Sequence, residues 1–120
     1  KSIKGSKILV LGIAYKRDID DVRESPALDV MTLLEQGGAR VDYYDSYVPK
    51  IKWNDKDKSS KKNLTAETLH SYNAIVVLTD HSNVDYDLVK SESTLIIDTR
   101  NVFSGVKDSK IIRLGSSQNI

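Results

Sequence analysis

Several polar side chains in this sequence follow apolar runs, where the carboxyl end of a strand would place them. One such polar segment, residues 13–24, holds three cations and four acids. Asp45, His81 and Arg100 follow three further apolar runs. Cations at such positions can bind phosphate or carboxylate groups, and carboxylates or imidazoles can transfer protons. The candidate chemistries are therefore anion binding and acid–base catalysis.

Catalysis by this chain alone lacks the residues it would need. The sequence contains no Cys, which excludes a cysteine nucleophile and a thiolate zinc site, and its two His are too few for an all-histidine metal site. Thr79, Asp80 and His81 are adjacent, but a hydrolytic triad needs a nucleophile on a strained turn, and no G-x-S-x-G motif is present. We therefore interpret His81 as a loop residue held by a hydrogen bond.

Anion binding has to use side chains rather than bare backbone. A dinucleotide fingerprint needs three glycines, and only Gly12 is present, with Ala14 and Arg17 at the later positions. A phosphate near this segment would have to be neutralised by Lys16 or an Arg. Asp45 stands where a dinucleotide domain places the acid that holds a ribose, and it also fits a turn or a helix cap, so both interpretations stay open.

Two further assignments each keep an alternative. Residues 13–24 exceed the usual length of a connection between strand and helix, and such loops are often functional, but their mixed charges also suit a self-neutralising surface loop. Arg100, followed by Asn101, suits a bidentate grip on phosphate or carboxylate. It equally suits an ion pair with Asp98 or another acid that shapes the turn.

The elements that must position these residues alternate between strands and helices. Ser25 and Pro26 predict the start of a helix that ends near Gly37, and shorter helices are expected at 65–70 and 85–90. This order predicts a three-layer, Rossmann-like α/β domain with a mainly parallel sheet. Apolar runs place its strands near 7–12, 40–45, 74–78, 94–98 and 110–114.

Length and composition fit one small domain. The 120 residues allow a single core at about 5–114, with 115–120 as a tail. No apolar stretch is long enough to span a membrane and no secretory signal precedes the first strand, so we expect a soluble, cytoplasmic protein. Residues 50–62 hold six Lys, two Asp and one Trp, and predict a mobile lysine-rich loop rather than a nucleic-acid or membrane surface.

Three stretches of the sequence carry a specific resemblance. They read ILVLGIAYKRDIDDVRESPALDVMTLLEQGGARVDYYD from residue 8, VVLTDH from residue 76 and LIIDTRN from residue 95. Together they resemble the C-terminal UDP-binding domain of the UDP-glucose/GDP-mannose dehydrogenase family, and are most similar to its UDP-N-acetylhexosamine 6-dehydrogenases, such as those acting on UDP-N-acetylmannosamine. The resemblance covers about residues 5–114, and the lysine-rich segment 50–62 matches no family signature.

The resemblance implies an activity shared among several parts of a larger enzyme. Enzymes of this family oxidise the C6 alcohol of a UDP-sugar to a carboxylate with two NAD and a thiohemiacetal on a Cys, and serve polysaccharide biosynthesis. An N-terminal domain binds NAD, a central helical region follows, and the C-terminal domain closes over the nucleotide of the substrate. This chain would be the third part, inactive alone, within a cytoplasmic homo-oligomer.

The resemblance also implies roles for particular residues, none of them catalytic and none a metal ligand. Tyr15, Lys16 and Arg100 match positions that contact the UDP part of the substrate, and Arg23 matches an Arg that reaches toward NAD. Acids of the same segment would orient these cations: Asp20, Asp21 and Glu24.

A receiver-like regulatory module is the alternative from another class of protein. Such a module would place its acid pair next to the first strand and a Lys late in the chain. Asp20 and Asp21 instead lie well past Gly12, and Arg113 stands where that Lys would be. The spacing favours the dehydrogenase interpretation, although a shared fold alone cannot decide function.

Overall fold

The computed structural model describes residues 3–114, which form a five-stranded sheet, a separate two-stranded hairpin and three helices. The sheet has the order β2-β1-β5-β6-β7, and all neighbouring strands run parallel. Its strands are β1 (Lys7–Leu11), β2 (Arg40–Tyr44), β5 (Ala74–Val77), β6 (Ile96–Asp98) and β7 (Ile111–Arg113). The five predicted strands and the parallel sheet are confirmed.

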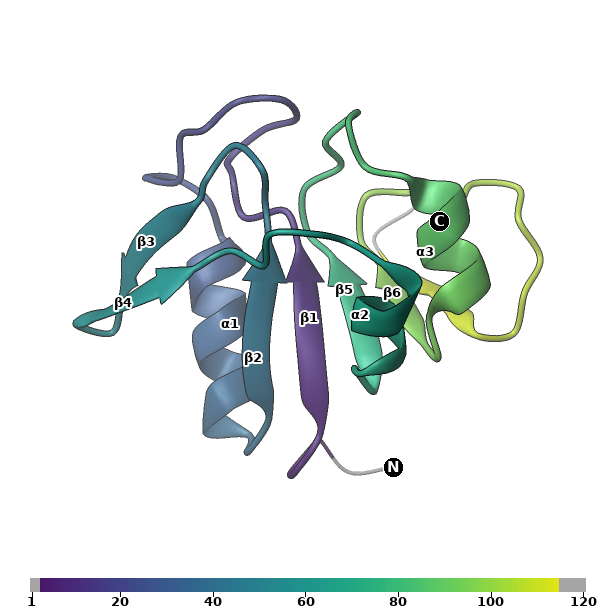
Figure 1. Ribbon diagram of the computed structural model, residues 1–120, viewed down its shortest axis with the longest axis horizontal. Helices are drawn as coiled ribbons and strands as arrows, with labels where there is room; N and C mark the ends of the chain where they lie inside the picture. The colour runs from purple at the N-terminus through teal and green to yellow at the C-terminus, as the bar shows by residue number, and fades with distance from the viewer. Residues whose placement is uncertain (1–2, 115–120) are drawn as a thin grey trace.

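Helices cover both faces of the sheet, so the domain has three layers (Figure 1). Helix α1 (Ala27–Gln36) packs on one face, and α2 (Ala66–His70) and α3 (Tyr86–Glu92) pack on the other. Successive strand residues point to opposite faces, so Val10 joins the core under α1 while Leu11 joins the core under α2 and α3. The prediction of a three-layer α/β domain is confirmed.

The start of α1 that Ser25 and Pro26 predict is confirmed, with Ala27 as the first residue of the helix. The backbone of Pro26 is already helical, and the Ser25 hydroxyl oxygen accepts a hydrogen bond from the N–H of Ala27 at 3.1 Å. Ser25 therefore satisfies one of the free N–H groups at the helix start. The short helices expected at 65–70 and 85–90 are confirmed as α2 and α3.

The prediction of a loop at 50–62 is wrong for most of that segment. β3 (Lys50–Trp53) and β4 (Lys56–Ser59) form an antiparallel hairpin, whose turn has positive φ at both Asn54 and Asp55. Ile51 and Trp53 alternate toward the core and are buried, and the Trp53 Nε1–H donates a hydrogen bond to the Thr32 hydroxyl on α1 at 3.0 Å. These two side chains anchor the segment, and its mobility stays a prediction.

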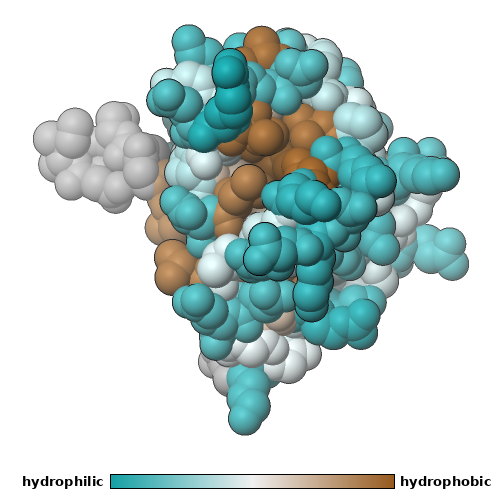
Figure 2. Space-filling model, turned by 90° about the vertical axis from the view of Figure 1, so that its left-hand side faces the viewer, coloured by the Kyte–Doolittle hydropathy of each residue, from teal (hydrophilic) through white to brown (hydrophobic). Residues whose placement is uncertain are grey.

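The side of the molecule that carries the hairpin combines charge with an apolar hollow. Figure 2 shows hydrophilic side chains around a recess lined by apolar ones on this side.

Every helix within residues 3–114 is too short or too polar to cross a bilayer. The tail expected at 115–120 lies outside the described residues.

Gly12 joins β1 to the loop that follows, with a backbone that other residues fit poorly. Its φ is +81°, and a Cβ at this position would lie 2.3 Å from the carbonyl oxygen of Thr79. Its N–H also donates to the carbonyl oxygen of Tyr44 at 2.9 Å. The loops after β1, β2 and β5 therefore approach one another closely at Gly12.

Gly12→Ala is expected to lower the free energy of unfolding by about 3 kcal/mol, because the added methyl group meets backbone that cannot move aside. Gly5→Ala is the matched control: Gly5 has a φ of +82° but no atom within 4 Å of the added Cβ, so only the strain of about 1 kcal/mol applies. Urea unfolding followed by Trp fluorescence gives both values. Equal losses would show that the contact with Thr79 is unimportant.

Candidate functional site

A buried carboxylate holds the loop after β1 against the carboxyl edge of the sheet. Asp45, at the end of β2, is 1% exposed. Its Oδ2 accepts hydrogen bonds from the N–H groups of Ile13 at 2.8 Å and Ala14 at 3.2 Å, and its Oδ1 accepts from the N–H of Tyr47 at 2.9 Å. The structure therefore supports the turn interpretation of Asp45, because a carboxylate buried and engaged in this way is not free to hold a ribose.

His81 extends this arrangement to the loop after β5. Its Nδ1 accepts a hydrogen bond from the N–H of Asp18 at 2.8 Å, so the ring hydrogen lies on Nε2, which donates to Asp45 Oδ2 at 2.9 Å. The side chain is almost fully buried. The interpretation of His81 as a hydrogen-bonded loop residue is confirmed.

Further hydrogen bonds close the space between the loops after β1 and β5. The Thr79 hydroxyl donates to the carbonyl oxygen of Ala14 at 2.6 Å. The hydroxyl and the N–H of Ser82 donate to the Asp18 carboxylate at 2.7 and 2.8 Å, which lowers the pKa of Asp18. In open α/β sheets ligands bind where the strand order reverses, here between β1 and β5. Hydrogen bonds within the protein join the two loops at that position, and a cavity remains beside them, with Arg17, Asp80 and His81 in its lining.

Two guanidinium groups share one carboxylate beside this network. Arg17 donates through Nε, at 3.2 Å, and through Nη2 to Asp80 Oδ2, and Arg100 Nε lies 3.6 Å from Asp80 Oδ1. Both arginines line a cavity of about 330 Å³, together with Tyr86 and Asn101. The pair carries one positive charge more than Asp80 neutralises, so the cavity suits an anion.

The acid that partners Arg100 is Asp80 rather than Asp98. Asp98 instead accepts hydrogen bonds from the backbone N–H groups of Arg100, Val102 and Phe103 and shapes the turn. Sequence reasoning missed Arg17 as a site residue. Its position next to Lys16, across the sheet edge from an acid that follows β5, is the signal that could have identified it.

Tyr15 and Lys16 lie together on the outer surface of the loop. Tyr15 is 45% exposed, and Lys16 Nζ lies 5.6 Å from the centre of its ring. The Tyr15 N–H donates to the carbonyl oxygen of Asp21 at 2.7 Å, so the backbone beneath the pair is fixed. Lys16 and Arg100 are both exposed cations, in the loops that follow the parallel strands β1 and β6.

Arg23 is oriented by an acid two residues before it. Its Nε and Nη2 donate to the two carboxylate oxygens of Asp21 at 3.1 and 2.9 Å, and these bonds lower the pKa of Asp21 to about 2. The Arg23 side chain remains 85% exposed. The expected orienting role is met for Asp21, whereas Asp20 and Glu24 make no side-chain hydrogen bond or ion pair with the residues described.

The residues described contain no group of three or more His, Asp or Glu side chains that could hold a metal ion. The polar side chains at the carboxyl edge of the sheet serve two purposes. The acids after β2, β5 and β6 satisfy backbone N–H groups and guanidinium groups, and the cations remain exposed. An anionic ligand fits this arrangement.

The chain is similar to known proteins over most of its length. Residues 9–105 match the model of the UDP-glucose/GDP-mannose dehydrogenase family, UDP binding domain. The chain is 37% identical over 109 residues to the UDP-glucose 6-dehydrogenase TuaD of Bacillus subtilis, covering 86% of this chain and 24% of that protein. It is 30% identical over 106 residues to the UDP-N-acetyl-D-mannosamine dehydrogenase of Methanocaldococcus jannaschii, covering 82% and 23%.

Solved structures agree with these matches. The structure described as NDP-N-acetyl-D-galactosaminuronic acid dehydrogenase from Methanosarcina mazei aligns with a TM-score of 0.70 and 30% identity, over 94% of this chain and 25% of that one. A UDP-D-ManNAc dehydrogenase from Pyrococcus horikoshii aligns with a TM-score of 0.69 and 28% identity, over 90% and 25%. The chain thus spans about a quarter of the length of these relatives.

Asp45→Ala is expected to lower the free energy of unfolding by about 3 kcal/mol, because three backbone N–H groups and the His81 ring N–H lose their acceptor. The amides of Ile13 and Ala14 should also lose their protection from hydrogen exchange. Asp20→Ala, which removes an exposed carboxylate from the same loop, is the control and should change stability by less than about 0.5 kcal/mol. Unchanged protection of Ile13 and Ala14 in the Asp45 variant would contradict the assignment.

Proposed function

The chain belongs to the UDP-glucose/GDP-mannose dehydrogenase family, and on that premise we propose that it is the UDP-binding part of an NAD-dependent enzyme that oxidises C6 of a UDP-sugar to a carboxylate. The observation that carries the proposal is the family match over residues 9–105. The matched region includes the loop after β1, residues 13–24, which Asp45 holds in place, and the exposed cations of this loop. Relatives named for UDP-glucose and for UDP-N-acetyl-D-mannosamine support a UDP-sugar as the substrate class.

The exposed cations have the chemistry that a UDP-sugar requires. Lys16 can neutralise a diphosphate oxygen, and the half-exposed ring of Tyr15 beside it can pack on the flat or apolar part of the substrate. Arg100 can leave its long contact with Asp80, 3.6 Å, and donate a bidentate pair of hydrogen bonds. Because the backbone of the loop is already fixed by Asp45, little ordering is needed when the ligand binds.

NAD fits this chain only as a peripheral contact. Asp45 is buried and its carboxylate is engaged by N–H groups of the protein, so it is not free to hold the ribose of a dinucleotide. Arg23, exposed and aimed by Asp21, can reach a phosphate of NAD held by another domain. When bound, NAD would accept the hydride from C6. The thiol for the covalent step would come from another part of the enzyme, since this chain has no Cys.

The same family assignment supports the proposed partners. We infer an N-terminal NAD-binding domain and a central helical region, in a cytoplasmic homo-oligomer that serves polysaccharide biosynthesis. The 120-residue chain alone is then inactive as a dehydrogenase. A receiver-like module finds no supporting observation, because Asp20 and Asp21 lie on the exposed loop while Asp45 is buried and engaged.

In the complete enzyme, Lys16→Ala and Arg100→Ala are expected to weaken binding of the UDP-sugar, and Arg23→Ala to weaken binding of NAD. Each substitution should cost about 1.5–3 kcal/mol of binding free energy, because one charge-assisted hydrogen bond is lost. Arg100→Lys should restore little, because one ammonium cannot replace a planar fork. Lys107→Ala, an exposed charge elsewhere on the chain, is the control. The measurement is steady-state kinetics with each substrate varied in turn.

One outcome would contradict this division between the two ligands. If Lys16→Ala and Arg23→Ala raised the same Michaelis constant equally and left the other unchanged, the loop would serve a single ligand.

A further inference from the structure

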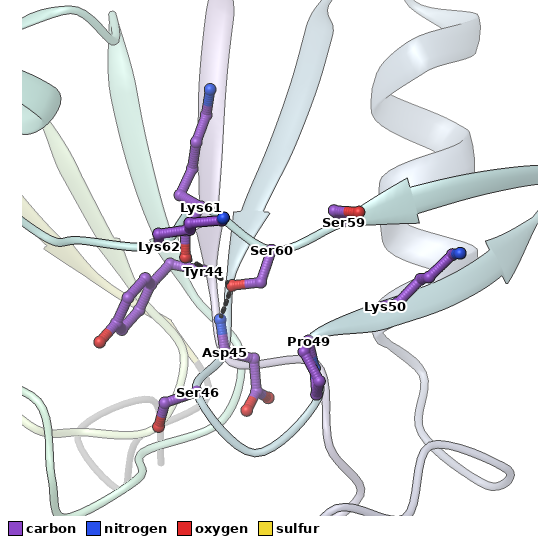
Figure 3. Close-up of a pocket in the computed structure, with 9 residues that line it drawn as sticks. All are labelled: Tyr44, Asp45, Ser46, Pro49, Lys50, Ser59, Ser60, Lys61 and Lys62. Atoms are coloured by element: carbon purple, nitrogen blue, oxygen red, sulfur yellow. Dashed lines mark hydrogen bonds between the residues drawn. The ribbon is translucent and has the colours of Figure 1, made fainter.

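A second cavity lies beside the end of β2, on the side of the hairpin (Figure 3). Its volume is about 600 Å³, within the range of small-molecule sites. Lys50 borders it at the start of β3, and Lys61 and Lys62 border it just after β4, with Tyr44 and Pro49 supplying apolar wall. It shares no lining residue with the cavity of Arg17 and Arg100.

Backbone hydrogen bonds fix the frame of this hairpin cavity. The N–H of Lys61 donates to the carbonyl oxygen of Tyr43 at 2.9 Å, and the N–H of Ser60 donates to that of Pro49 at 2.9 Å. The Asp45 N–H donates to the Ser60 hydroxyl oxygen at 2.9 Å, as Figure 3 shows. These bonds join the end of the hairpin to β2 and its two ends to each other, so the cavity exists before any ligand binds.

The three lysines of the cavity are little used by the fold. Lys50 lies 3.7 Å from Asp57 and Lys61 lies 3.8 Å from Asp42, both at the outer limit of an ion pair. Lys62 makes no ion pair with any residue the structure describes. The one acid in the lining, Asp45, directs its carboxylate to Ile13, Ala14 and His81 instead. Three lysines thus border the cavity, and two of them are held by acids outside its lining only at the limit of an ion pair.

We infer that the hairpin cavity is a second anion site, which binds a phosphate- or diphosphate-bearing small molecule through Lys50, Lys61 and Lys62. Lysine ammonium groups bind phosphate as compact point charges. Lys50 extends along the hairpin and Lys61 along the strands of the sheet in Figure 3, so each would have to leave its acid, Asp57 or Asp42, to turn toward one ligand. Tyr44 and Pro49 would contact an apolar or flat part of the same molecule. This site is separate from the UDP surface at Tyr15, Lys16 and Arg100 and does not depend on it.

The test is a titration of the ¹⁵N-labelled chain with inorganic pyrophosphate, followed by NMR. The amides of Ser60, Lys61 and Lys62 should shift in a saturable manner. Lys61→Gln/Lys62→Gln should weaken binding at least about five-fold, by loss of two charge-assisted contacts. The matched control, Lys52→Gln/Lys56→Gln, removes the same charge from the hairpin outside the cavity and should weaken binding less than about two-fold. Far-UV circular dichroism checks that both variants fold.

Several outcomes would overturn the inference. Equal weakening by the two double variants would show diffuse attraction by net charge, and saturable shifts confined to residues 13–24 and 98–102 would show that no second site exists.

A parallel titration with UDP separates this inference from the proposed function. Loss of UDP binding in Lys61→Gln/Lys62→Gln but not in Arg100→Ala would make the cavity the UDP site itself. Pyrophosphate binding as expected, with no UDP binding at all, would contradict the proposed function and leave the second site standing.

Discussion

The Asp45 carboxylate is the interaction on which the carboxyl edge of this domain depends. It ends β2, yet it binds the first two residues of the β1 loop, the turn at Tyr47 and the ring of His81 from the β5 loop. A buried carboxylate is costly unless its lone pairs are used, and here four N–H donors use them. Three segments far apart in the sequence are thereby held in one arrangement, with Gly12 giving the close approach that the arrangement requires.

This constraint separates the acids of the edge from its cations. Asp45, Asp80 and Asp98 are buried and act on the protein itself, whereas Lys16, Arg23 and Arg100 remain exposed. The loop after β1 also exposes Asp20 and Glu24, so the positive charge offered to a ligand is local to the three cations. A loop of this length would ordinarily be mobile, but hydrogen bonds donated to Asp45 and hydrogen bonds received from Thr79 and Ser82 fix its first half. Exposed cations on a fixed backbone suit recognition of a diphosphate.

Local patterns predicted most of the fold, and contacts between distant segments account for what was missed. The apolar runs and the Ser25 helix start could be identified because each depends on neighbouring residues. The hairpin was missed because the many lysines of this segment are typical of a loop. The alternation that indicates a strand rests on only two apolar residues, Ile51 and Trp53, whose burial depends on α1. Two interpretations of Asp45 stayed open, as a turn residue or as the acid that holds a ribose. Its hydrogen bond with His81, 36 residues away, decides between them and cannot be seen from neighbouring residues. Arg17 was missed for the same reason, because its partner Asp80 lies 63 residues on.

We propose that the hydrogen bonds around Asp45 are structural and that the exposed cations bind the nucleotide. The decisive experiment is a crystal structure of the chain with UDP. Asp45 should keep its hydrogen bonds to Ile13, Ala14 and His81 while the diphosphate lies against Lys16 or Arg100. A ribose hydroxyl bound to the Asp45 carboxylate, with the loop after β1 displaced, would show that Asp45 is a ligand residue instead.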